Sequence, residues 1–122
     1  MILADTTIWI DHLRRQDARM EELLRRGQIL MHPWIVAELS LGSLRDRRNF
    51  LAALDGLFQA NVASLNEVRQ FIEARKLYAM GIGLTDAQLV ASCLITPGTK
   101  LWTRDAALNR VALALGIAAG LP

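Results

Sequence analysis

The sequence predicts an α/β fold in which a short parallel sheet is covered by helices on both faces. Short apolar runs of the kind that form buried strands alternate with segments whose apolar residues have helical spacing. Parallel strands need a crossover connection, so the helices between them must pack over the sheet. A chain of 122 residues is a comfortable size for one domain and short for two. Since no linker or repeat divides it, we expect one domain over residues 1–122.

The first half of the chain predicts two strands and the helices that follow them. Both strands are short and apolar. A hydroxyl residue can cap a helix, and a proline suits the first turn because its missing N–H costs nothing there. In chain order we expect a strand, two helices, a second strand and a third helix: Ile2–Ala4, a helix capped by Thr6 or Thr7, Asp17–Gly27, Ile29–Met31 and Pro33–Gly42.

The second half predicts two more strands among longer helices. Two glycines, Gly81 and Gly83, break one helical pattern, and the run Thr85–Gln88 after them has the form of a capping box. The expected elements are two helices around a third strand, then a helix, a last strand and a final helix: Asp46–Phe58, Asn61–Leu65 as the strand, Asn66–Met80, Thr85–Leu94, Leu101–Thr103 and a helix from Asp105.

Composition excludes several classes of protein. The chain is 52% hydrophobic and 21% charged, which rules out a disordered segment. Its longest apolar run, Val111 to Leu121, contains two glycines and is shorter than the roughly 20 residues that span a bilayer. The single cysteine, Cys93, cannot form an internal disulfide, and no secretory signal is visible. We therefore expect a cytoplasmic protein with no membrane association.

Four acidic residues fall where such a fold would bring them together. Asp5 follows the first strand, and Asp105 follows the last strand within two residues. Glu38 lies one to two turns into the helix after the second strand, and Asp86 lies at the start of a later helix. Ligands of parallel α/β sheets bind beyond the carboxyl ends of the strands. Each acid alone also fits a plain structural role, as a turn residue, a helix cap or an exposed helix position.

Taken together, the four carboxylates predict a site for a divalent cation. Carboxylates that share one cleft repel each other, which raises their pKa values unless a cation is present. Mg²⁺ prefers oxygen ligands and retains several waters. A cation held in this way can activate water and offset negative charge on a phosphate. The pattern therefore indicates chemistry on phosphoryl groups.

The segments around these acids also resemble a known family. Four segments occur in order along essentially the whole chain: Ile2–Asp11, Val36–Leu39, Leu84–Ala91 and Leu101–Asp105. Together they resemble the PIN-domain family, and within it the VapC toxins of bacterial toxin–antitoxin pairs. The resemblance implies a compact three-layer α/β/α fold and a ribonuclease that depends on Mg²⁺ or Mn²⁺. It also implies a homodimer and a cognate antitoxin that occludes the acidic site.

The resemblance assigns roles to individual residues. The four acids match the family's metal-binding and catalytic set: Asp5, Glu38, Asp86 and Asp105. Thr7 matches a small hydroxyl residue that supports the first aspartate. Many relatives carry a further acid at the position of Ala107, so Asp105 is the one acidic candidate after the last strand. Asp11 also recurs in the family's first motif, and we interpret it as structural.

The sequence thus predicts a metal-dependent endoribonuclease toxin that acts on RNA and is inhibited by an antitoxin. Arg104, beside Asp105, is the arginine nearest the cleft in sequence and a candidate to bind flanking phosphates. One alternative is a response-regulator-like phosphoacceptor that uses Asp55, Thr85 and Lys100. It is disfavoured because Asp55 lies in a helical run and two threonines follow Asp5. A second alternative is a catalytically silent relative that binds RNA without cleaving it.

Overall fold

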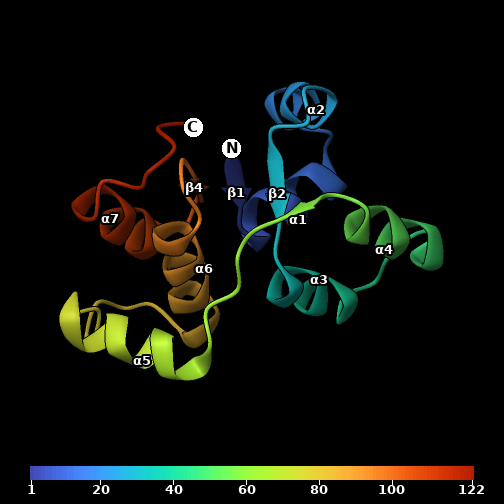
Figure 1. Ribbon diagram of the computed structural model, residues 1–122. Coiled ribbons are helices and arrows are strands. Elements are labelled where there is room, and N and C mark those ends of the chain that lie inside the picture. Colours follow the sequence, from blue (N-terminus) through green and yellow to red (C-terminus); the bar gives the residue numbers. More distant parts are fainter.

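The computed structural model describes residues 1–122 and contains one four-stranded parallel sheet (Figure 1). Its strands are β1 (Ile2–Ala4), β2 (Ile29–Met31), β3 (Phe58–Gln59) and β4 (Lys100–Trp102). They lie in the order β3-β2-β1-β4, and all three pairs are parallel. The chain moves outward from β1 to β3 and then returns to the free side of β1. The strand order therefore reverses between β1 and β4, the kind of point where open α/β sheets bind ligands.

Seven helices pack around this sheet, which confirms the predicted three-layer α/β/α class. Figure 1 shows the last three helices on the β4 side of the sheet and the first four on the β2 side. None of the seven is both long enough and apolar enough to cross a membrane. Their bounds are α1 (Thr6–Arg14), α2 (Ala18–Arg25), α3 (Pro33–Ser40), α4 (Arg47–Asp55), α5 (Leu65–Ala74), α6 (Leu84–Ile95) and α7 (Ala106–Ala114).

The hydrophobic core consists of a main cluster of 22 buried residues between the strands and the helices and a smaller cluster of four buried residues that includes Val68 of α5 and Ala87 of α6. Each Leu, Ile or Val side chain that is fully buried stabilises the fold by about 1.5–3 kcal/mol. Helix α6 runs through the centre: every residue from Ala87 to Cys93 is buried. A helix buried to this extent cannot shift without disturbing the core. Its first turn, which carries Asp86, continues directly into this buried segment.

The third strand is shorter and earlier than the predicted Asn61–Leu65. β3 pairs with β2 through Phe58 and Gln59, and the N–H of Ala60 adds one more bond to the carbonyl of Met31. β2 ends there because the next residue begins the cap of α3. With no strand left to pair with, Asn61 instead bonds the end of α6 through Thr96 and the carbonyl of Ile95.

Two helix starts near the sheet also differ from the prediction. The cap of α1 is Asp5 rather than Thr6 or Thr7, because the Asp5 carboxylate accepts the N–H groups of Thr7 and Ile8. Helix α6 begins at Leu84, and the Asp86 carboxylate reaches back to the N–H of Gly83, 3.3 Å away. Thr85 is therefore not a cap, and its hydroxyl is left to bond elsewhere.

Three other boundaries lie earlier than predicted. Helix α4 ends at Asp55, so Phe58 belongs to β3 instead. Helix α5 ends at Ala74 rather than Met80, since Lys76 has a φ of 54° and left-handed residues cannot continue a right-handed helix. Strand β4 is Lys100–Trp102, one residue ahead of the predicted range, because the N–H of Lys100 bonds the carbonyl of Met1.

Candidate active site

Asp5 lies at the end of β1, where the strand order reverses, and is only 3% exposed. Its Oδ1 accepts hydrogen bonds from the N–H of Thr7 at 3.0 Å, from the N–H of Ile8 at 3.3 Å and from the Thr7 hydroxyl. Its Oδ2 accepts the hydroxyl of Thr103. Burial raises the pKa of Asp5, and these bonds oppose the shift because they stabilise the charged form.

Thr103 joins the ends of β1 and β4, and sequence reasoning did not identify it. Ala4 pairs with Trp102 across the two strands, so the residues that follow them, Asp5 and Thr103, lie side by side. The buried Thr103 hydroxyl donates to Asp5 and accepts the N–H of Asp105 at 3.0 Å. One side chain thus fixes the first and the last acid of the predicted set.

Asp105 is exposed at the start of α7, as predicted. Its Oδ2 accepts the N–H of Leu108 at 2.8 Å and caps the helix. Thr7 completes this side of the site: its hydroxyl donates to Asp5 and accepts the N–H of Arg104 at 3.0 Å. The contact that the resemblance implied between Thr7 and Asp5 is therefore present.

Glu38 comes from the other side of the site. It is exposed on α3, and its Oε1 accepts the hydroxyl of Thr85 at 2.8 Å. This bond links α3 to the first turn of α6, next to Asp86. Glu38 also lines a hollow between α1 and α3, whose apolar wall includes Ile10, Leu13 and Leu39.

Asp86 shows that the four carboxylates share one electrostatic environment. Burial is the main cause that raises its pKa, and the negative charges of the other three acids raise it further: Asp105, Asp5 and Glu38. The structure therefore brings the four predicted acids together at the carboxyl edge of the sheet. No three acidic, histidine or cysteine side chains converge closely enough to form a finished metal cage.

The chemistry of the donor set fits a divalent hard cation. All four side chains offer carboxylate oxygens, and their mutual repulsion favours a bound positive charge. Mg²⁺ is usually bound through one or two carboxylates and otherwise through water, so an open set of acids is compatible with it. Oδ2 of Asp5 accepts one protein hydrogen bond and so keeps a lone pair for a further partner.

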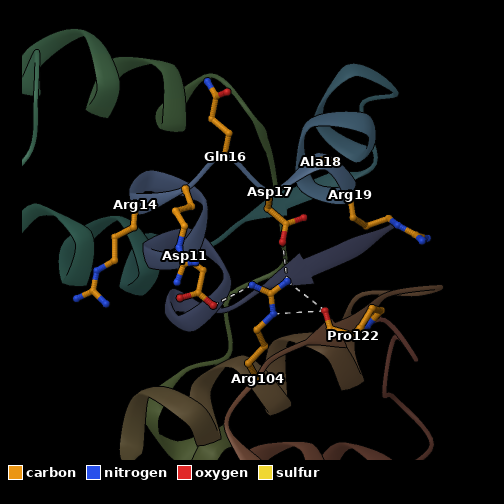
Figure 2. A pocket seen from close by; sticks show the side chains of 9 residues that line it. Asp11, Arg14, Gln16, Asp17, Ala18, Arg19, Arg104 and Pro122 are labelled. Carbon is orange, nitrogen blue, oxygen red and sulfur yellow. Dashed lines mark hydrogen bonds and ion pairs between the residues drawn. The ribbon is translucent and has the colours of Figure 1, made fainter.

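Arg104 is engaged within the protein (Figure 2). Its guanidinium contacts Asp11 at 2.8 Å and Asp17 at 2.6 Å, and it donates twice to the carbonyl of Pro122. The group uses four of its five N–H donors and stacks over Trp102, with 5.5 Å to the ring centroid. These contacts leave little of Arg104 for a phosphate, and they fit the structural role predicted for Asp11.

The phosphoacceptor alternative does not match the structure. Asp55 is the exposed last residue of α4, away from any strand end. Thr85 bonds Glu38, and the Lys100 ammonium donates to the carbonyl of Gly116 at 2.8 Å. The three residues that such a module needs are therefore committed to different parts of the fold.

The signals for the two missed threonines were weak in the sequence. Thr103 is one hydroxyl after an apolar strand, which is common, and only the register of β1 with β4 sets it against Asp5. Thr85 looked like a helix cap, and that interpretation obscured its availability to Glu38. Both contacts depend on parts of the chain that are distant in sequence.

A parallel sheet with four acids at its switch point is the arrangement expected of the family named from the sequence. The family model of the PIN domain matches residues 2–114, and the chain belongs to the PIN domain family. Within that family it is similar to two relatives, both named Ribonuclease VapC32, from two strains of Mycobacterium tuberculosis. Each is 41% identical over 118 residues, which cover 97% of this chain and 95% of the relative.

Proposed function

We propose that this protein is a metal-dependent endoribonuclease toxin of the VapC type, in which residues 1–122 act as one catalytic domain. The observation that carries the proposal is the grouping of four carboxylates at the switch point, where burial and then the charges of the other three acids raise the pKa of Asp86. The relatives named Ribonuclease VapC32 support the reaction class. Because the proposed substrate is RNA, the proposed place of action is the cytoplasm.

The four acids are the proposed ligands of Mg²⁺ or Mn²⁺, directly or through water: Asp5, Glu38, Asp86 and Asp105. When bound, such a cation activates water and offsets the charge that develops on the scissile phosphate. The chain's own part is to hold the acids in place. Thr7 and Thr103 fix both oxygens of Asp5, and Thr85 fixes one oxygen of Glu38. Without a cation, the carboxylates would repel the RNA backbone.

The proposal includes a cognate antitoxin that covers the acidic site and a homodimer. The hollow beside Glu38 supports a protein partner, because its walls are half apolar and two of its side chains are substantially exposed: Ile10 at 40% and Leu13 at 44%. A segment with apolar anchors and a basic side chain would match both the hollow and the acid. Sedimentation or size-exclusion measurements of the free protein test the dimer.

Cleavage of RNA by the isolated protein is the direct test. The protein is purified without any antitoxin and incubated with structured RNA, with Mg²⁺, with Mn²⁺, and with EDTA. Asp5→Asn and Asp86→Asn are the test variants, and Asp55→Asn is the matched control because it removes an exposed acid outside the site. We expect each test variant to lower kcat by roughly 100- to 1,000-fold, the range for losing one charge-stabilising group.

The outcomes separate the alternatives. Cleavage that persists in EDTA, or that both test variants retain, contradicts the proposal. RNA that is bound and never cut identifies the catalytically silent relative. Covalent labelling of Asp55 by acetyl phosphate would instead restore the phosphoacceptor hypothesis.

A further inference from the structure

Arg104 connects three separate parts of the chain at one point. Its guanidinium binds Asp11 in α1 and Asp17 at the cap of α2, together with the carbonyl of Pro122 (Figure 2). The Arg104 side chain is 30% exposed, and Asp17 is 18% exposed. This is more enclosed than the other ion pairs of the protein, in which Arg25 and Arg26 bind Glu22 and are 72% and 68% exposed. Partly enclosed, forked arginine pairs hold geometry better than exposed pairs do.

The backbone of Arg104 belongs to the acidic site itself. Its N–H donates to the Thr7 hydroxyl, which in turn donates to Asp5. The residues on either side are Thr103, which bonds Asp5, and Asp105, a proposed ligand. The loop between β4 and α7 therefore carries Thr103 and Asp105, which belong to the acidic site, and also the Arg104 guanidinium, which binds α1 and the cap of α2. A shift of the Arg104 side chain would therefore also move Thr103 and Asp105.

We propose that Arg104 is a positioning residue for the reaction, an inference that rests on the proposed function. Its guanidinium ties the loop that carries Thr103 and Asp105 to helices α1 and α2. This tie keeps the β4 side of the site in register with Asp5 and Thr7. The residue acts through Thr7 and Asp105, and it does not contact the reacting atoms.

The charge balance favours this role over phosphate binding. Asp11 and Asp17 already offset the charge of the Arg104 guanidinium, so the positive charge that an anion would meet in this hollow belongs to the other three arginines that line it. A phosphate would also have to displace carboxylates at 2.6 and 2.8 Å. Arg19 lines the same hollow and makes no ion pair, so it is the appropriate control for loss of charge (Figure 2).

The sharpest variant is Asp17→Asn, because it leaves Arg104 intact. Asparagine still caps α2, since its side-chain oxygen can accept the N–H of Met20 as Asp17 does now. If Arg104 positions the loop, kcat for RNA cleavage falls by roughly 10- to 100-fold with KM unchanged, the size of an effect from a small misplacement. If Arg104 binds phosphate, the same variant frees the arginine, and KM falls instead.

Arg104→Gln and Arg104→Lys complete the kinetic test. Both should lower kcat. Glutamine carries no positive charge, and the single ammonium of lysine cannot reproduce a guanidinium that binds two carboxylates at once. Arg19→Gln should keep kcat and change at most KM and its salt dependence. A rise in KM with kcat unchanged for the Arg104 variants, matching Arg19→Gln, overturns the proposal.

A readout that needs no cleavage keeps the two proposals distinguishable. Amide hydrogen exchange reports the N–H groups of Arg104 and Asp105 directly, which now bond the hydroxyls of Thr7 and Thr103. In Asp17→Asn we expect both to exchange about fivefold faster, the size of one partly exposed ion pair. Unchanged exchange rates in a folded variant contradict the proposal that the Arg104 guanidinium holds the loop in place. A wild-type protein that cuts no RNA rejects the proposed function and leaves this measurement valid.

Discussion

Asp5 and Glu38 represent two opposite ways of placing a carboxylate at one site. Asp5 is buried at a strand end and accepts four hydrogen bonds, from two backbone N–H groups and two threonine hydroxyls. Glu38 is exposed on a helix, and a single hydroxyl, that of Thr85, holds it. The strand side of the site is therefore built into the fold, whereas the helix side depends on one contact across α3 and α6.

The difference carries an electrostatic cost on the strand side. Burial raises the pKa of Asp5, and its four hydrogen bonds offset only part of that shift. The charged form of Asp5 thus depends on its donors, while water can solvate Glu38. Removing a donor should therefore harm the strand side of the site more than the helix side.

The largest effect is expected for Thr103→Val, which keeps the side-chain volume but removes both the donor to Oδ2 of Asp5 and the acceptor for the N–H of Asp105. A hydrogen bond to a charged group contributes about 1.5–3 kcal/mol, so the free energy of unfolding at neutral pH should fall by about 2 kcal/mol. Loss of such a supporting contact typically lowers activity by roughly 10- to 100-fold. Urea unfolding and single-turnover RNA cleavage measure the two effects.

Thr99→Val is the matched control for that variant. Thr99 is also buried near β4, but its hydroxyl has no hydrogen-bond partner. Replacing an unpaired buried hydroxyl by a methyl group is neutral or stabilising. Equal losses in both variants would show that packing near β4, and not the bond to Asp5, explains the effect.

The contrast between Asp5 and Glu38 also explains what the sequence could predict. Asp5 could be predicted from the sequence because an apolar strand that ends in an acid is a local pattern, and the fold places every such strand end at one edge of the sheet. Glu38 could be predicted because it is an acid within an otherwise apolar helix. The supporting roles of Thr103 and Thr85 could not be predicted, because their partners are 98 and 47 residues away in sequence. The third strand was misplaced for a similar reason: its two residues are exposed, and only the short length of β2 determines where pairing stops.

A smaller effect is expected for Thr85→Val, which releases Glu38. The lost bond is exposed and contributes about 1 kcal/mol, so cleavage should slow by roughly fivefold with little change in stability. Thr85→Ser keeps the hydroxyl and should restore the rate, which separates the bond from the packing of the threonine methyl. A loss as large as that of Thr103→Val would remove the distinction between the two sides of the site.

The smallest effect on cleavage at neutral pH is expected from His32, which caps the helix that carries Glu38. Its Nδ1 accepts the N–H of Trp34 at 3.0 Å, and burial lowers its pKa from 6.5 to about 4. The unfolded chain therefore binds the proton more readily, and the stabilisation present above pH 6.5 is lost as the pH falls toward 4.

Between pH 7 and pH 5 the free energy of unfolding should drop by about 2 kcal/mol because of His32. His32→Gln retains an acceptor for the N–H of Trp34 and should reduce that drop in urea unfolding. The same acid sensitivity in wild type and His32→Gln would mean that groups other than this cap control how the helix side of the site responds to pH.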